Sequence, residues 1–183
     1  MRGTLQSLLA QALLSRPATI APPAPDKAAL AELAESLRRR PRPLLGRSLS
    51  IREIDAGSCN GCELEINALG NAVYDLERFG LKFVASPKHA DLLLVTGPVT
   101  RNMKIALERA YEVTPDPKWV VAVGDCGAGC GVFAGSPACI GSVAQVIPVD
   151  LHIKGCPPRP LDLLAGLLAL LDIASGLSPT GRG

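Results

Sequence analysis

Six cysteines are distributed over this chain, and five of them lie in three short glycine-containing segments. These segments are residues 57–63 (GSCNGCE), 124–130 (GDCGAGC, which carries two cysteines) and 155–160 (GCPPRP). Glycine lets the backbone approach a bulky inorganic core, and proline stiffens the chain just after a ligand. Cysteine thiolates in such segments are typical iron–sulfur ligands. The segments therefore predict a cluster and, with it, electron transfer.

A [4Fe–4S] cluster takes four thiolates, one for each iron. The C-x-x-C spacing of Cys59 and Cys62 lets one turn of chain direct both sulfurs at the same cluster. Cys126 and Cys156 supply the third and fourth thiolates. We therefore expect Cys59, Cys62, Cys126 and Cys156 to bind the iron of one [4Fe–4S] cluster.

Other roles for these cysteines stay open at this point. A C-x-x-C pair also occurs in dithiol redox proteins and as half of a structural zinc site. Dithiol chemistry would not need the two later segments, whereas the C-x3-C spacing of Cys126 and Cys130 keeps a zinc-stabilised interaction module as an alternative. Disulfides are disfavoured, because 183 residues suffice for a core and no clear secretory signal is present.

The hydrophobic pattern predicts strands that alternate with helices. Strands are expected at residues 49–54, 81–84, 90–96, 119–124 and 146–153, and helices at residues 63–79, 101–114 and 161–172. Such alternation predicts an α/β fold with a doubly wound sheet. Each cysteine segment directly follows a predicted strand, and ligands of such sheets gather at the carboxyl ends of the strands. We therefore expect the three segments to meet at one edge of the sheet.

Residues 1–47 precede this domain and carry no cluster ligand. They contain an amphipathic stretch (1–19), a proline-rich linker (21–25) and a helix (26–40) that Pro41 ends. Five basic residues cluster at the end of this helix and after it: Arg38, Arg39, Arg40, Arg42 and Arg47. We predict a helical appendage (1–47) that docks on a partner subunit or the membrane, an iron–sulfur α/β domain (48–172) and a flexible tail (173–183).

The overall composition excludes some classes of function. The net charge is only +2 and aromatic residues make up 3% of the chain, so a nucleic-acid surface with stacking aromatics is not expected. The longest apolar run, residues 163–171, is far shorter than the roughly 20 residues of a membrane-spanning helix. A membrane association would therefore be peripheral.

The cysteine segments together resemble a known family. C-x-x-C-E, then G-D-C after an apolar strand, then G-C-P-P-x-P resembles the small, cluster-bearing subunit that [NiFe]-hydrogenases share with respiratory complex I, over residues 48–172. Residues 55–66 (DAGSCNGCELEI) are most similar to membrane-bound, energy-converting hydrogenases of the formate hydrogenlyase type. In complex I the first two cysteines are adjacent instead.

This resemblance implies a flavodoxin-like core and a [4Fe–4S] cluster held by Cys59, Cys62, Cys126 and Cys156. It implies electron transfer between a [NiFe] large subunit and a ferredoxin-like subunit, in a complex with membrane subunits at the cytoplasmic face of the inner membrane. A complex I-like quinone oxidoreductase is the alternative. Cys126 is preferred over Cys130 because it matches the family's position after Gly-Asp.

Several further residues have two interpretations. Cys130 and Cys139 fall outside the family pattern. Cys130 either competes with Cys126 for iron or is a packed thiol, and we expect both cysteines to be packed thiols. Glu63 follows a ligand at a helix start, where it either stabilises the helix N-terminus or carries protons near the cluster. Arg159 either raises the cluster potential or is a plain surface residue.

Overall fold

The computed structural model describes residues 27–39 and 45–175. These residues form a five-stranded sheet in the order β2-β1-β3-β4-β5, and every neighbouring pair is parallel. The strands are β1 (Leu49–Asp55), β2 (Leu81–Phe83), β3 (Leu92–Thr96), β4 (Trp119–Val123) and β5 (Leu151–Ile153). This is the flavodoxin-like strand order, so the predicted fold class is confirmed.

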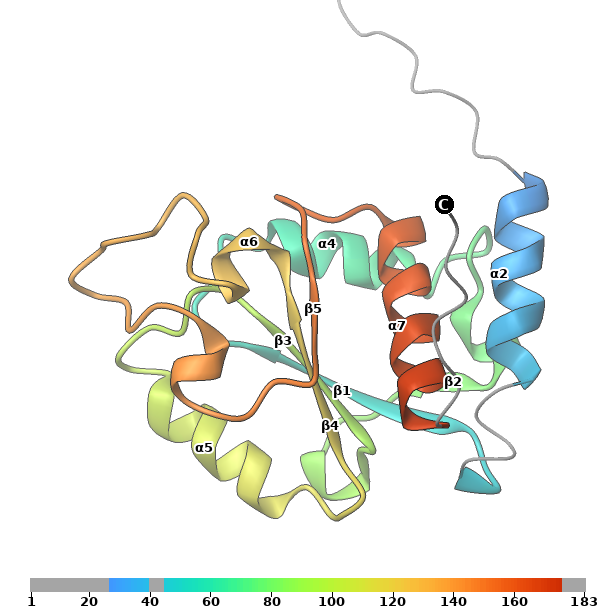
Figure 1. The fold of residues 1–183 in the computed structure, drawn as a ribbon, viewed down its shortest axis with the longest axis horizontal. Helices are drawn as coiled ribbons and strands as arrows, with labels where there is room; N and C mark the ends of the chain where they lie inside the picture. The colour runs from blue at the N-terminus through green and yellow to red at the C-terminus, as the bar shows by residue number, and fades with distance from the viewer. Residues whose placement is uncertain (1–26, 40–44, 176–183) are drawn as a thin grey trace, which may run out of the picture.

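Helices cover both faces of the sheet (Figure 1). One face carries α2 (Lys27–Arg39), α4 (Gly61–Ala68) and α7 (Pro160–Ala174), and the other carries α5 (Lys104–Val113). The connections include α6 (Gly124–Gly127) and three short 3₁₀ turns: η1 (Leu76–Phe79), η2 (Pro87–His89) and η3 (Val143–Gln145).

The hydrophobic core has two layers because the central strands are buried on both sides. Along β3 the fully buried side chains alternate, so that Leu92 and Leu94 join the layer under α2, α4 and α7. Leu93 and Val95 join the layer under α5. A continuous apolar run is what a parallel strand covered on both faces requires.

Two elements are shorter than the sequence pattern predicts. The helix expected over residues 63–79 ends at Ala68. Asn71 explains the break, since its Oδ1 accepts the backbone N–H of Val73 (2.8 Å) and Tyr74 (3.0 Å) and so closes a turn. The strand expected over residues 146–153 begins only at Leu151, and the chain before it forms η3 and an irregular segment that contains Pro148.

Helix α2 packs against the domain. It lies beside α7 and also contacts η1 (Figure 1). Leu37 on α2 is fully buried in the same layer as Ile51 and Leu92. The described part of the expected appendage therefore shares the core of the α/β domain. The amphipathic stretch 1–19, the linker 21–25 and residues 176–183 of the tail lie outside the described residues, and the predicted domain boundaries stay predictions.

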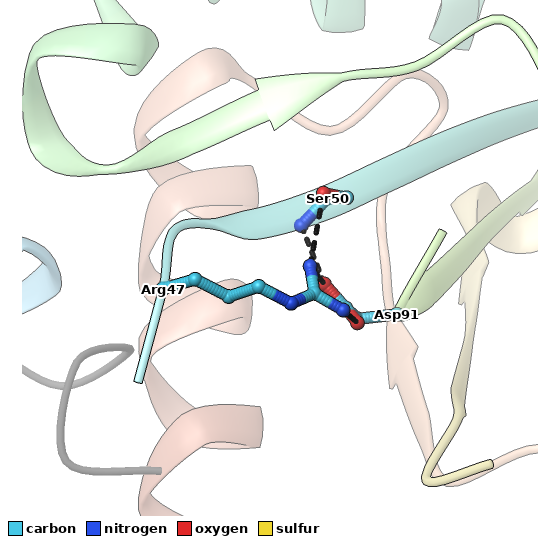
Figure 2. A network of polar contacts seen from close by, with 3 residues as sticks. All are labelled: Arg47, Ser50 and Asp91. Atoms are coloured by element: carbon cyan, nitrogen blue, oxygen red, sulfur yellow. Dashed lines mark hydrogen bonds and ion pairs between the residues drawn. The ribbon is translucent and has the colours of Figure 1, made fainter. Parts of the chain in front are cut away.

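Arg47 is held against the sheet (Figure 2). Its guanidinium donates to both carboxylate oxygens of Asp91, at 2.9 Å and 2.6 Å, and the Asp91 carboxylate also accepts the Ser50 backbone N–H at 2.9 Å. Because Asp91 is buried, this bidentate pair satisfies a charge that would be costly alone. Arg47 thus fixes the start of β1 to the start of β3, and its charge is already neutralised.

Candidate metal centre

Four cysteines line one cavity at the carboxyl ends of the strands. The cavity has a volume of about 90 Å³, and its sulfur-bearing residues are Cys59, Cys62, Cys126 and Cys156. Its remaining lining residues are Ser58, Gly61, Gly97, Asp125, Gly155 and Pro157. The segments follow β1, β4 and β5, which are not all neighbours in the sheet. The structure thus brings together the four cysteines that the sequence pattern singles out.

Hydrogen bonds fix the first segment between β1 and α4. Oδ1 of Asp55 accepts the backbone N–H groups of Gly57 and Ser58, each at 2.7 Å. Cys59 follows this turn, and Cys62 is the second residue of α4. Because only a few residues separate β1 from the first turn of α4, both sulfurs reach the same cavity.

Glycines allow the neighbouring loops to approach the first segment closely. A Cβ on Gly97 would lie 2.7 Å from the backbone nitrogen of Ser58, and Gly97 has φ +83°. A Cβ on Gly124 would lie 2.6 Å from Sγ of Cys62, and Gly124 has φ +81°. Both contacts are too short for any side chain, and both backbones are left-handed, so only glycine fits.

The thiol of Cys62 is strongly affected by its surroundings. Burial, followed by the charges of Glu63 and of the neighbouring Cys59, Cys126 and Cys156, raises its pKa to about 12. Burial also raises the pKa of Cys126, while hydrogen bonds from the backbone N–H groups of Phe133 and Val132 oppose this. Metal ions bind thiolates, so occupation of this cavity would release protons from these thiols.

The two remaining cysteines do not line the cavity. Cys130 is exposed, and its Sγ donates to the backbone oxygen of Asp125 at 3.3 Å. The expectation of a packed thiol is therefore wrong for Cys130, because its side chain is exposed and its sulfur meets only a backbone oxygen of its own loop. Cys139 is half-buried, and its backbone pairs with Thr100. It lines a neighbouring hollow of about 280 Å³, and Cys126 lines both this hollow and the cavity.

Glu63 is buried beside the cavity without lining it. Its side chain is 7% exposed, and neither carboxylate oxygen has a hydrogen-bond partner among the described residues. Glu53 on β1 is half-buried, and its pKa is raised to about 7, first by burial and then by the charge of Glu63. Sequence reasoning missed Glu53, although the alternation of Leu49, Ile51 and Glu53 along β1 could have indicated an inward position.

Arg159 is already engaged in an ion pair. Its Nε and Nη2 donate to the two carboxylate oxygens of Asp162, each at 2.9 Å, at the start of α7. The plain surface interpretation of Arg159 therefore fits the structure better than a charge directed at the cavity. His152 reaches the other side of the site, where its Nε2 lies 2.9 Å from the backbone oxygen of Gly124.

The donor set fits a [4Fe–4S] cluster. Four thiols from three loops surround a cavity, and the glycines leave room for an inorganic core. Among residues 27–39 and 45–175, no three side chains of His, Cys, Asp or Glu converge closely enough to hold a single metal ion.

The comparison with protein families gives one clear match. Residues 59–170 match the model of the 20 kDa subunit of NADH ubiquinone oxidoreductase, which covers more than half of the chain. The chain belongs to this family. The predicted resemblance to the cluster-bearing subunit of complex I and hydrogenases is thereby confirmed, and the family places this member in oxidoreductase complexes.

Relatives of this family member include hydrogenase subunits. It is 48% identical over 128 residues to the probable membrane-bound hydrogenase subunit mbhJ of Pyrococcus furiosus. The aligned residues make up 70% of this chain and 77% of that protein. It is 44% identical over 127 residues to formate hydrogenlyase subunit 7 of Escherichia coli, covering 69% of this chain and half of that protein.

A solved structure has the same fold. It is described as the membrane-bound sulfane sulfur reductase, an archaeal respiratory membrane complex. One of its chains superimposes with a TM-score of 0.64 and 35% identity, covering 79% of this chain and 77% of that one. The Pyrococcus furiosus protein and the sulfane sulfur reductase are thus described as membrane-bound. None of the helices described for this chain is long and apolar enough to span a membrane.

Proposed function

We propose that this chain is an electron-transfer subunit of a membrane-associated hydrogenase and carries one [4Fe–4S] cluster. Electrons pass between a [NiFe] large subunit and a ferredoxin-like subunit through this cluster. The observation that carries the proposal is the single cavity lined by Cys59, Cys62, Cys126 and Cys156. The similarity to two hydrogenase subunits supports the choice of complex.

The residues of this chain have separate tasks in this proposal. The four thiolates each bind one iron, and a bound cluster supplies one-electron transfer. Gly97 and Gly124 keep side chains out of the space between the loops. Cys59 and Cys156 are exposed, so the cavity lies near the surface, where a partner subunit can bring its own redox centre close. In this proposal the chain binds no substrate itself.

Glu63 is the residue that we assign to proton transfer. Its carboxylate is buried next to Cys62 and lacks a hydrogen-bond partner in the described part of the chain. A buried carboxylate beside a redox centre can take up a proton when an electron arrives. Helix stabilisation is the other role, since Glu63 also lies in the first turn of α4.

We further propose that the subunit binds peripherally at the cytoplasmic face of the inner membrane. Its partners are the [NiFe] large subunit, a ferredoxin-like subunit and the membrane subunits of the complex. The relatives are parts of membrane-bound complexes, which supports this location. Residues 1–26 and the arginines at 38, 40 and 42 provide the docking segment, whereas Arg47 does not take part because Asp91 neutralises it.

Purification of the complex under nitrogen tests the proposal. We expect about four irons and four sulfides for the cluster of this chain, and hydrogen evolution from a low-potential electron donor. A complex that contains the chain but neither nickel nor hydrogenase activity would overturn the hydrogenase assignment. One zinc and no visible absorption in the isolated chain would favour the zinc-stabilised module instead.

The same purified complex can be used to test two electron acceptors other than protons, each of which corresponds to an alternative function. Membership in the complex I family favours quinone as the first alternative. The fold match to a sulfane sulfur reductase favours a sulfur compound as the second. Quinone reduction sensitive to complex I inhibitors, or reduction of a polysulfide without hydrogen turnover, would identify these functions.

A further inference from the structure

Asp125 connects the segments that carry the third and fourth thiolates. Its backbone N–H donates to the backbone oxygen of Gly155 at 2.9 Å. Its Oδ1 accepts the backbone N–H of Gly155, also at 2.9 Å. Asp125 precedes Cys126 and Gly155 precedes Cys156, so this pair of hydrogen bonds fixes the spacing of the two ligand-bearing loops.

Further hydrogen bonds immobilise Asp125 itself. Its backbone oxygen accepts the backbone N–H of Cys130 at 3.0 Å. The residue before it, Gly124, is bonded through its backbone oxygen to His152 on β5. Asp125 also lines the cavity of the four cysteines. Its carboxylate is therefore held at one position beside the cavity rather than moving freely at the surface.

The charge of this carboxylate is not balanced nearby. Within residues 27–39 and 45–175, no arginine, lysine or histidine forms an ion pair with Asp125. Lys154, the cation closest to Cys156 in sequence, is exposed and forms no ion pair with Asp125, and Arg159 is paired with Asp162. A fixed negative charge opposes the arrival of an electron at a neighbouring cluster, and Asp125 is half-buried, so water screens this charge only in part.

We propose that Asp125 is a positioning residue that holds the Cys126 and Cys156 loops together and lowers the reduction potential of the bound cluster through its carboxylate charge. This inference rests on the proposed function, because it requires the cluster. A lowered potential suits a complex that delivers electrons to protons. The sequence pattern includes this aspartate in its G-D-C segment but gives it no role.

Three substitutions separate positioning from charge. Asp125→Asn keeps an oxygen that accepts the Gly155 N–H but removes the charge. Asp125→Glu keeps the charge on a longer side chain, and Asp125→Ala removes both. Glu77→Gln is the matched control, because it removes one exposed carboxylate in η1, at the opposite end of the sheet from the cavity.

The experiment uses the whole complex, purified under nitrogen, with two readouts. Iron content after incubation with a chelator reports how firmly the loops hold the cluster. A redox titration followed by electron paramagnetic resonance reports its midpoint potential. We expect Asp125→Asn to retain iron and to move the midpoint to a more positive value. We expect Asp125→Ala to lose iron faster, and Asp125→Glu and Glu77→Gln to keep the wild-type potential.

Each contrary result has its own meaning. A wild-type subunit without iron overturns the proposed function and this inference with it. A wild-type cluster whose midpoint is unchanged in Asp125→Asn overturns the charge effect, as does an equal positive shift in Asp125→Glu. Full iron retention by Asp125→Ala under the chelator overturns the positioning role.

Discussion

Gly124 lies directly against the sulfur of Cys62. A Cβ at this position would be 2.6 Å from Sγ, although the two residues belong to loops that follow different strands. The backbone of Gly124 also has φ +81°, which side chains rarely adopt. One glycine therefore determines how closely the β4 loop approaches the first cysteine pair.

Substitution of this glycine gives the first prediction. Gly124→Ala should displace the loop of Cys126 from Cys62 and reduce the iron content of the purified subunit. Gly135→Ala is the matched control, because Gly135 also has positive φ but a Cβ there would meet no atom within 4 Å. Equal iron loss in both variants would show that backbone strain, rather than the contact with Cys62, causes the effect.

The cysteines divide into two groups in the second prediction. Alanine at Cys59, Cys62, Cys126 or Cys156 should abolish or severely reduce cluster content, because a missing thiolate leaves an iron open to solvent. Alanine at Cys130 or Cys139 should leave iron content and activity unchanged, because neither residue lines the cavity. Iron and acid-labile sulfide analyses measure this, and a loaded Cys126→Ala beside an iron-free Cys130→Ala would contradict our choice of ligand.

The third prediction concerns the pH dependence of stability. Burial raises the pKa of Glu53 to about 7 in the folded protein, above its ordinary value of 4.5. The folded state therefore favours the protonated form, so stability falls as the pH rises through this range. Glu53→Gln should remove this component and unfold at a higher temperature than the wild type at about pH 8, with a smaller difference at about pH 5.

Differential scanning calorimetry at both pH values measures the effect of Glu53→Gln. The control is Glu77→Gln, because Glu77 is exposed and its loss should change the two melting temperatures equally. Parallel pH profiles of Glu53→Gln and the wild type would mean that Glu53 does not titrate differently in the folded and unfolded chains.

The fourth prediction concerns α2. Leu37 is fully buried between this helix and the sheet domain, so Leu37→Ala should lower the free energy of unfolding by about 2–5 kcal/mol. Arg39→Ala on the same helix should cost at most about 1 kcal/mol, because its ion pair with Glu35 is exposed. Denaturant unfolding measures both values, and a negligible effect of Leu37→Ala would restore the view of α2 as a separate appendage.

The sequence by itself determined the class of fold and the identity of the candidate ligands. Apolar strands alternating with helices specify a parallel sheet, and a cysteine segment after a strand must lie at the carboxyl edge of that sheet. Both inferences depend on local patterns and on general rules of chain connection. The expectation that the three cysteine segments meet at one edge of the sheet followed from those rules without any coordinates.

Only the tertiary structure decided which neighbours these residues have. The pairing of Arg47 with Asp91 joins residues 44 positions apart. The exposure of Cys130, the burial of Glu53 and the bonds between Asp125 and Gly155 likewise depend on segments that are distant in sequence. Hydrophobic periodicity reports which face of an element is buried, whereas hydrogen bonds and close contacts depend on which segments the folded chain brings together.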